Sequence, residues 1–236
     1  IYNILISKIL NEINPASRIS ILKGNKIFGA AILKKKDLST IVIGTNNEVI
    51  NPLYHGEIST IYQYFNLGLN KKIIPTECIF LSTHEPCSLC LSAITWSGFD
   101  NFYYFFPYKE TKDKFNIPHD LNILKEIFKL NNGNYNKTNS YWKSYSIIDE
   151  INKLNNLEKN IINFKINKIY QEYDKLSKLY QKNKDKNIIP FNWFIYIYSL
   201  YYVLAGDTGK TEPKEQQPGN SQAKGPQKNN TLENEH

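Results

Sequence analysis

The sequence predicts an α/β protein with three layers, α/β/α, in which a mixed sheet of about five strands lies between helices. Three observations support this prediction. Short runs of β-branched and aromatic residues alternate with segments whose apolar residues recur at helical spacing. The first two strand-like runs are separated only by a short basic turn, which is typical of an antiparallel hairpin. The later runs are separated by helical segments, which favours parallel crossovers.

The spacing of apolar residues and the position of a proline predict the first helices and strands. Tyr2–Ile13 has helical periodicity and is expected to end at Asn14-Pro15, because a proline disfavours helix in the residue before it. Ile27–Leu33 and Thr40–Ile43 are the expected strands of the hairpin. His55–Leu69 has apolar side chains three and four residues apart and predicts the next helix.

The next elements repeat a strand–helix–strand pattern. Cys78–Ser82 is a strand-like run, and Cys87–Ser97 is the expected helix, with Gly98 well placed to end it. Asn101–Phe106 is an aromatic strand that stops at a proline. His119–Leu130 has helical spacing again, and it closes the part of the chain that we expect to form the core.

The chain divides by composition into three expected regions. Residues 1–130 form the predicted core, and residues 131–205 form a mainly helical extension that packs on the core or on a partner subunit. Within it, Ile147–Lys182 has long helical periodicity and predicts either one long helix or two packed ones. Residues 206–236 are rich in Pro, Gly, Gln, Asn, Lys and Glu, and we expect a disordered tail.

The segment Ile188–Ala205 is apolar and aromatic. A membrane-spanning helix needs about 20 apolar residues, and Pro190 and Asn192 interrupt this segment early. We therefore expect it to pack against the core or a second subunit of a homo-oligomer, most simply a dimer, rather than to enter a membrane.

Charge and cysteine content narrow the class of protein. Three cysteines allow no disulfide framework, which favours a reducing, cytoplasmic location. The formal net charge of +7 would suit RNA as a partner. The lysines are scattered along the sequence, however, which favours an ordinary solvated surface. The sequence shows no signal-peptide pattern, so we expect a soluble enzyme.

Two short motifs carry the predicted chemistry. His55-Gly56-Glu57 opens one expected helix, and Pro86-Cys87-Ser88-Leu89-Cys90 opens another, 29 residues further on. The two cysteines are three residues apart and share one helix face. One imidazole and two thiolates make three ligands of a tetrahedral zinc ion, which keeps its fourth position for water. We therefore expect one Zn²⁺ per chain, bound by His55, Cys87 and Cys90.

Glu57 completes the predicted active site. It lies in the first turn after His55, beside the metal but outside its ligand set, and we expect it to be the catalytic proton shuttle. Hydrolytic deamination uses a zinc ion to activate water and a neighbouring carboxylate to transfer protons. This pair of motifs is typical of zinc deaminases. A structural zinc with Cys78 or His84 as a fourth protein ligand is the alternative. Cys78 lies in a strand-like run, where a buried, inert cysteine is the commoner finding.

Both motifs resemble the cytidine deaminase-like superfamily. The similarity includes His55–Thr60 and Pro86–Gly98 and covers about residues 1–130. It is closest to the cytosine deaminases of the fungal type, then to guanine and tRNA adenosine deaminases. Ser88-Leu89 and Leu91-Ser92 depart from the residues usual in those groups. The resemblance implies the cytidine deaminase-like fold and a hydrolase that acts on C–N bonds of cyclic amidines, releasing ammonia.

The resemblance also implies a substrate contact. The family has an asparagine about eleven residues before the zinc histidine; Gly44 occupies that position here, and Asn46 takes the role if the loop is two residues shorter. A simple asparagine turn at Asn46-Asn47 is the alternative.

His84, Trp96 and Phe106 lie beside a motif or at a strand end and are candidates for the pocket wall, although aromatic side chains at such positions are more often core. We expect a nucleobase or nucleoside as substrate, with cytosine or cytidine favoured. A tRNA adenosine deaminase and an inactive, zinc-stabilised partner subunit are the alternatives.

Overall fold

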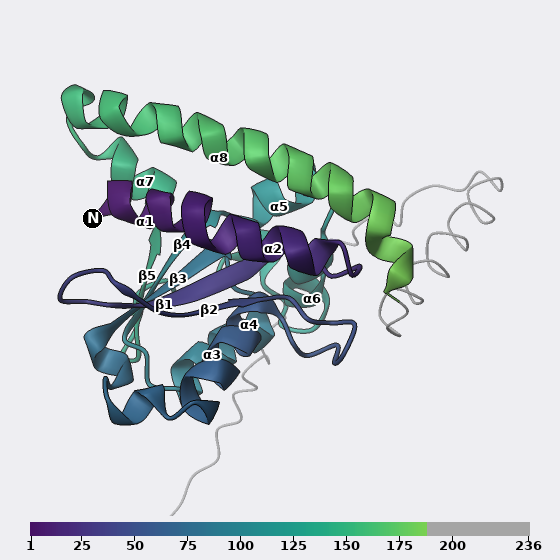
Figure 1. Cartoon of the computed structure of the whole chain (residues 1–236), viewed down its shortest axis with the longest axis horizontal. Helices are drawn as coiled ribbons and strands as arrows, with labels where there is room; N and C mark the ends of the chain where they lie inside the picture. Colours follow the sequence, from purple (N-terminus) through teal and green to yellow (C-terminus); the bar gives the residue numbers. More distant parts are fainter. Residues whose placement is uncertain (188–236) are drawn as a thin grey trace, which may run out of the picture. The chain divides into compact units, whose positions relative to one another are not determined.

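A five-stranded mixed sheet organises residues 1–187, the part of the chain that the computed structural model describes (Figure 1). The strand order is β2-β1-β3-β4-β5. β2 pairs antiparallel with β1, and β1 pairs antiparallel with β3, whereas β3, β4 and β5 are parallel. The strands are β1 (Gly29–Lys34), β2 (Thr40–Thr45), β3 (Cys78–His84), β4 (Asn101–Phe106) and β5 (Lys143–Ser146).

Helices cover both faces of this sheet. The α-helices are α1 (Tyr2–Lys8), α2 (Asn14–Ile21), α3 (Gly56–Asn66), α4 (Ser88–Trp96), α5 (Tyr108–Phe115), α6 (His119–Glu126), α7 (Ile147–Asn152) and α8 (Asn156–Asn183). A π-helical segment, Ile9–Ile13, joins α1 to α2, and short 3₁₀ turns are formed by Leu69–Lys71, Pro75–Glu77, Asn131–Gly133 and Lys184–Lys186.

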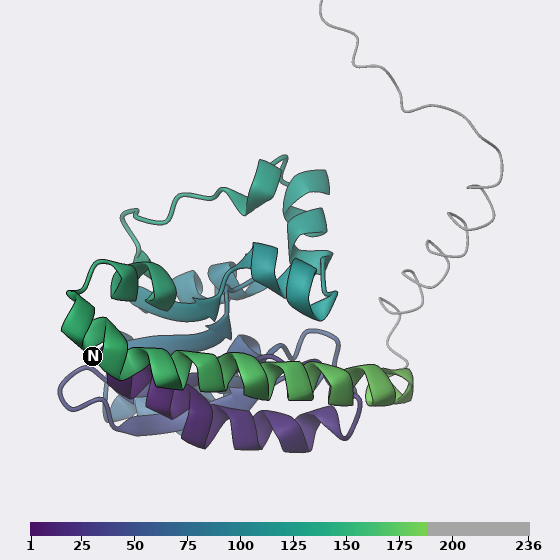
Figure 2. The ribbon, with the colours of Figure 1, turned by 90° about the horizontal axis from the view of Figure 1, so that it is seen from above.

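Alternation along the strands divides the core into two layers. Leu33 and Leu81 point to the face covered by α1, α2 and α8, whereas Ile32 and Phe80 point to the face covered by α3 and α4. Successive side chains of a strand lie on opposite faces, so each strand supplies both layers. Figure 2 shows α8 running beside α1 and α2 along one side of the sheet. The predicted three-layer α/β fold, with a mixed sheet of five strands and a helical C-terminal region, is confirmed.

The first helix does not end where the sequence predicted. The helical backbone continues through Asn14-Pro15 into α2, which ends at Ile21. Proline lacks an N–H and its ring crowds the carbonyl one turn back. The preceding π-helical turn, Ile9–Ile13, widens the backbone at that point, and Pro15 lies in the first turn of α2, where its missing donor costs little.

The sheet continues into the region expected as a helical extension. β5 lies within residues 131–205 and pairs with β4, so the core does not stop at residue 130. β5 was missed because Lys143–Ser146 is a short polar edge strand, and α5 was also missed. The long helical pattern of residues 147–182 forms two helices, α7 and α8. Ser146 and Asn155 cap them by accepting backbone N–H groups.

The predictions for residues 188–205 and 206–236 lie outside the described residues. Within residues 1–187, no helix is long and apolar enough to cross a membrane.

Candidate metal centre and active site

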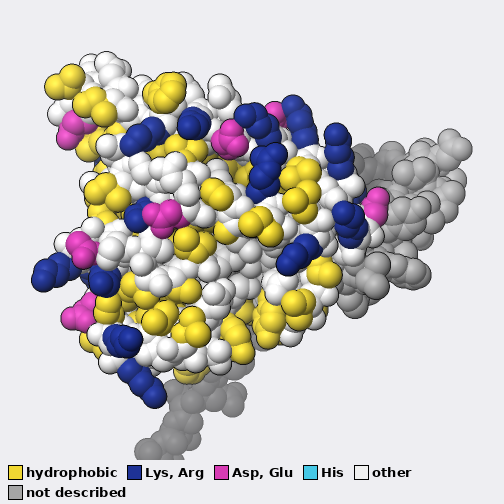
Figure 3. Space-filling model, in the orientation of Figure 1, with side chains coloured by type: hydrophobic (Ala, Val, Ile, Leu, Met, Phe, Trp, Pro, Cys, Tyr) yellow, Lys and Arg dark blue, Asp and Glu magenta, His cyan; other side chains and the backbone are white. Residues whose placement is uncertain are grey.

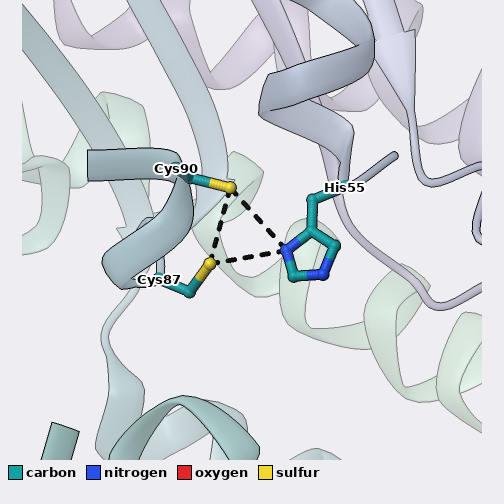
Figure 4. Close-up of side chains that lie close together, drawn as sticks. All are labelled: His55, Cys87 and Cys90. Atoms are coloured by element: carbon teal, nitrogen blue, oxygen red, sulfur yellow. Dashed lines mark hydrogen bonds between the residues drawn. The ribbon is translucent and has the colours of Figure 1, made fainter. Parts of the chain in front are cut away.

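His55, Cys87 and Cys90 meet at the N-terminal ends of two helices. His55 is the N-cap residue of α3, Cys87 is the N-cap residue of α4, and Cys90 lies in the first turn of α4. The Nδ1 atom of His55 lies 3.4 Å from Sγ of Cys87 and 3.7 Å from Sγ of Cys90. The two sulfur atoms are 3.5 Å apart. Figure 4 shows the three side chains converging, with Nδ1 facing the sulfurs.

These distances fit a tetrahedral zinc ion. With Zn–S bonds of about 2.3 Å and a Zn–N bond of about 2.05 Å, tetrahedral angles place two sulfurs about 3.8 Å apart and a sulfur and a nitrogen about 3.6 Å apart. The observed separations of 3.5, 3.4 and 3.7 Å lie within a few tenths of an ångström of these values. The three ligand atoms are mutually within 4.8 Å, so this group is positioned for a metal ion.

The alternative fourth ligands lie elsewhere. Cys78 is buried in the core under α3, where its Sγ is 3.8 Å from the Tyr64 hydroxyl and 3.4 Å from the carbonyl of Ile74. His84 is enclosed by aromatic rings on the opposite face of the sheet. In the part of the chain with described structure, the metal-binding group contains only His55, Cys87 and Cys90. This ligand count favours a catalytic zinc over a closed structural one.

The pKa values of the three ligand side chains are shifted in different directions. The hydrogen bond between Cys87 and Cys90 holds the pKa of the Cys87 thiol well below its usual value, and the hydrogen bond with His55 acts in the same direction against burial. Burial and the neighbouring Cys87 sulfur raise the pKa of Cys90. Burial alone would lower the pKa of His55, but the hydrogen bond and the charge of Cys87 raise it to about 9. Without a metal ion, Cys87 is therefore the more acidic of the two thiols.

Glu57 lies next to this group and is almost completely buried, with 4% of its surface exposed. Its Oε2 accepts from the Cys90 thiol at 3.4 Å, and its Oε1 accepts from the Ser82 hydroxyl at 2.9 Å. Burial, followed by the charge of Cys87, raises the pKa of the Glu57 carboxyl. A carboxyl group with a raised pKa can both accept and release a proton near neutral pH.

The family assignment follows from the comparison with known families. Residues 8–106 match the family described as the cytidine and deoxycytidylate deaminase zinc-binding region, and this range contains both motifs. Residues 8–106 therefore belong to the cytidine deaminase-like superfamily. The expected family and the expected zinc cofactor are both confirmed.

Three solved structures with similarity to this chain are as follows. A protein in complex with 2,6-diaminopurine is 22% identical over 48% of this chain, which spans 61% of that chain's length, with a TM-score of 0.41. The guanine deaminase of Bacillus subtilis is 25% identical over 54% of this chain and 84% of its own, with a TM-score of 0.39. A tRNA:A34 deaminase is 20% identical over 51% of this chain and 82% of its own, with a TM-score of 0.34. Among curated proteins, nothing matches this sequence.

Asn46 lies against the start of α3. Its Oδ1 accepts from the backbone N–H of Gly56 at 2.6 Å, and the side chain is fully buried. The amide nitrogen Nδ2 is buried as well and has no hydrogen-bond partner within residues 1–187. Asn46 therefore holds the loop that carries His55 while keeping an unused donor. A buried donor without a partner costs free energy, which a carbonyl group of a ligand would offset.

The structure does not bring the other three candidates to the metal group. His84 and Phe106 face each other in the core under α8, with ring centroids 4.9 Å apart. Trp96 is 91% exposed at the end of α4. Their expected role in the pocket wall is therefore corrected: two are core residues, and the third is a surface residue. Strand-end position did not reveal that His84 turns away from the face that holds Ser82.

Four polar residues near the metal group were missed. Glu48 lies 3.8 Å from Nε2 of His55 and pairs with Lys26 at 2.6 Å. The Asp120 carboxyl and the metal group act on each other electrostatically, and burial, then the charge of Cys87, raises the pKa of Asp120. Burial lowers the pKa of His119 to about 4. No local pattern indicates these residues, because Lys26, Glu48 and the His119-Asp120 pair reach the site from three separate parts of the chain.

Proposed function

We propose that this chain is a zinc-dependent hydrolytic deaminase that replaces the exocyclic amine of a nucleobase or nucleoside with oxygen and releases ammonia. Cytosine or cytidine is the favoured substrate. The observation that carries the proposal is a buried carboxylate, Glu57, beside three metal ligands, His55, Cys87 and Cys90. The family of residues 8–106 supports an enzyme that acts on C–N bonds.

The protein side chains have separate roles in this reaction. When zinc is bound, it supplies a positive charge that makes water a nucleophile near neutral pH. Glu57 accepts a proton from the attacking water and donates it to the ring nitrogen next to the amine-bearing carbon. Glu57 then takes the second proton from the added hydroxyl group and delivers it to the amine, so that the C–N bond breaks, the oxygen from water becomes the carbonyl oxygen and ammonia leaves. Proton transfer of this kind contributes about 10²–10⁴-fold to the rate.

The residues around Glu57 support this role. Ser82 donates to Oε1 and fixes the carboxyl group in one orientation. Burial raises the pKa of Glu57, which makes the protonated form a workable acid near neutral pH. Asn46 offers its unused Nδ2 donor to a carbonyl oxygen of the base, and we propose that it orients the ring.

The charges near the site support a free base or nucleoside rather than a nucleotide. Glu48, Glu57 and Asp120 are the acidic groups that act on the metal ligands. Lys26 lies close to them, but its ammonium group is already paired with Glu48. A substrate phosphate would therefore meet acidic side chains, and the one buried lysine described here is neutralised by its partner.

A tRNA adenosine deaminase is the second candidate, supported by one surface feature. The C-terminal half of α8 and the turn after it carry five exposed lysines, Lys175, Lys178, Lys182, Lys184 and Lys186. Figure 3 shows basic side chains gathered along this part of α8. Glu48 acts electrostatically on Tyr180, which supports a position of this part of α8 near the site. Basic side chains at such a position would attract an RNA backbone.

A substrate panel tests the proposal. The zinc-loaded full chain is incubated with cytosine, cytidine, guanine, adenosine or a tRNA anticodon stem-loop, and ammonia release is measured with zinc content. The Glu57→Gln variant provides the background. We expect release from cytosine or cytidine. Release only from the stem-loop would support the second candidate. A fully zinc-loaded protein inactive on every substrate would contradict both and leave the partner subunit as the interpretation.

A further inference from the structure

Lys26 and Glu48 form a buried ion pair beside the metal group. The Lys26 Nζ lies 2.6 Å from Oε1 of Glu48, and the two side chains are only 5% and 1% exposed. Lys26 precedes β1 and Glu48 follows β2, so the pair joins the two open ends of the hairpin. Burying two charges costs several kcal/mol per ion, and their attraction offsets this cost only with good geometry. Stability alone is therefore a weak explanation for the pair.

Glu48 faces the ring nitrogen of His55 that points away from the sulfurs. Its Oε1 lies 3.8 Å from Nε2, whereas Nδ1 of the same ring faces Cys87 and Cys90 (Figure 4). The imidazole thus lies between two sulfur atoms and a carboxylate. The second oxygen of Glu48, Oε2, is buried and accepts no hydrogen bond from the residues that the structure describes.

A carboxylate in this position selects one tautomer of a neutral histidine. Its negative charge favours a proton on Nε2, and that tautomer leaves the lone pair of Nδ1 free to bind a metal ion. Lys26 keeps the carboxylate in place because its ammonium group binds the same oxygen that faces Nε2. The backbone next to Glu48 is also held, since the N–H of Val49 donates to Oδ1 of Asn25 at 3.0 Å.

We propose that Glu48 is a positioning residue for the metal site, which fixes the Nε2–H tautomer and the orientation of His55, and that Lys26 anchors it. This inference rests on the zinc site of the proposed function but not on the reaction, because its tests measure metal binding. A chain that is inactive on every substrate would leave it unaffected.

The first test measures metal binding in Glu48→Gln, which keeps the shape of the side chain and removes its charge. The zinc dissociation constant is measured by competition with a chromophoric chelator, and the site geometry by the absorption bands of the Co²⁺-loaded protein. We expect zinc binding to weaken about 10- to 100-fold, with shifted cobalt bands. The matched control is Asp100→Asn, which breaks the half-exposed ion pair of Lys35 and Asp100 and should leave the zinc constant unchanged.

The double variant Lys26→Met/Glu48→Gln separates positioning from stability. Removing both charges leaves no unpaired buried ion, so its thermal midpoint should stay near that of the original chain. We expect zinc binding to remain about tenfold or more weaker. A double variant, or a folded Glu48→Gln variant, with the original zinc constant would overturn the proposal.

Nuclear magnetic resonance of the unmodified chain gives a test that requires no variant. In the zinc-loaded, ¹⁵N-labelled protein, we expect the His55 ring to carry its proton on Nε2 and the metal on Nδ1. Zinc on Nε2, or a proton on Nδ1, would contradict the assigned role of Glu48.

Discussion

The hydroxyl of Ser82 donates a hydrogen bond to Oε1 of Glu57 at 2.9 Å, connecting the central strand β3 to the first turn of α3. The other oxygen of Glu57 faces Cys90 at 3.4 Å. One carboxyl group is therefore held between the sheet and a metal ligand. This arrangement fixes Glu57 without including it among the ligands.

Glu57→Gln should keep the fold and the metal but lose turnover. The amide has nearly the same shape and can still accept from Ser82, yet it cannot carry a proton between water and substrate. We expect the rate of ammonia release to fall at least about 10²–10⁴-fold, with zinc content unchanged. Ser82→Ala is the matched control, because it removes only the orienting hydrogen bond and should cost far less activity. Substantial turnover by Glu57→Gln would remove this residue from the shuttle role.

The metal group predicts one zinc ion per chain. Cys90→Ser should lower the zinc content, measured by elemental analysis, well below one ion per chain, because a serine hydroxyl is a poor ligand compared with a thiolate. Cys78→Ser is the control, since Cys78 lies in the core and outside the metal group. Loss of zinc from the Cys78 variant, with its fold intact, would argue for a fourth protein ligand.

Glu85 should stabilise the loop that carries Cys87. Its carboxylate is buried and accepts from the N–H of Tyr108 at 3.1 Å, from the Tyr135 hydroxyl at 2.9 Å and from Lys137 at 2.9 Å. Glu85→Ala removes this acceptor from the Tyr108 N–H and the Tyr135 hydroxyl, whereas Lys137 keeps its hydrogen bond to the Tyr104 hydroxyl, so we expect unfolding free energy to fall by about 2–3 kcal/mol. Tyr135→Phe removes one donor and should cost about 1 kcal/mol. Equal losses in urea unfolding of the two variants would contradict this account.

Gly56 is the middle residue of the first motif, and the structure explains why a side chain does not fit there. A Cβ atom at this position would lie 2.9 Å from Cα of Gly29 and 3.0 Å from its nitrogen, both in the backbone. Gly56→Ala should therefore push α3 away from β1, lower the unfolding free energy by about 1–3 kcal/mol and weaken zinc binding through His55. Ser92→Ala, on an exposed position of α4, should change neither quantity. A fully stable Gly56→Ala variant would show that the helix moves freely.

The burial of His84 should make the protein less stable in mild acid. Burial among aromatic rings holds its pKa well below 6.5, so the folded protein keeps the ring neutral. Above about pH 6.5 both the folded and unfolded states are neutral at this residue, and it adds no pH dependence. Below that pH the unfolded chain binds a proton that the folded chain does not, so unfolding free energy should fall, with a slope that approaches about 1.4 kcal/mol per pH unit.

Urea unfolding at pH 7.5, 6.5 and 5.5 checks this slope. His84→Leu cannot be protonated at this position, and its unfolding free energy should change by about 1 kcal/mol less between pH 6.5 and 5.5 than that of the original chain. His119 acts in the same direction, because burial lowers its pKa to about 4. The original protein and the His84→Leu variant should therefore both lose some unfolding free energy as the pH falls. An unchanged slope in the His84 variant would contradict the prediction.

The sequence alone determined the metal ligands and the central elements of the fold. Cys87 and Cys90 are three residues apart, His55 and Glu57 are two apart, and such spacings depend on local helix geometry. The β4 bounds, Asn101–Phe106, agree with the prediction for the same reason, since a run of aromatic residues favours a strand locally.

Only the tertiary structure decided what surrounds the ligands. Glu48 reaches His55 from the end of β2, Asp120 reaches the site from α6, and Tyr135 reaches Glu85 across 50 residues of sequence. His84 is a core residue because α8, which lies far along the chain, packs over it through Tyr173. Local spacing carries no information about such contacts, because they form only when the two faces of the sheet are covered and each buried polar group finds a partner.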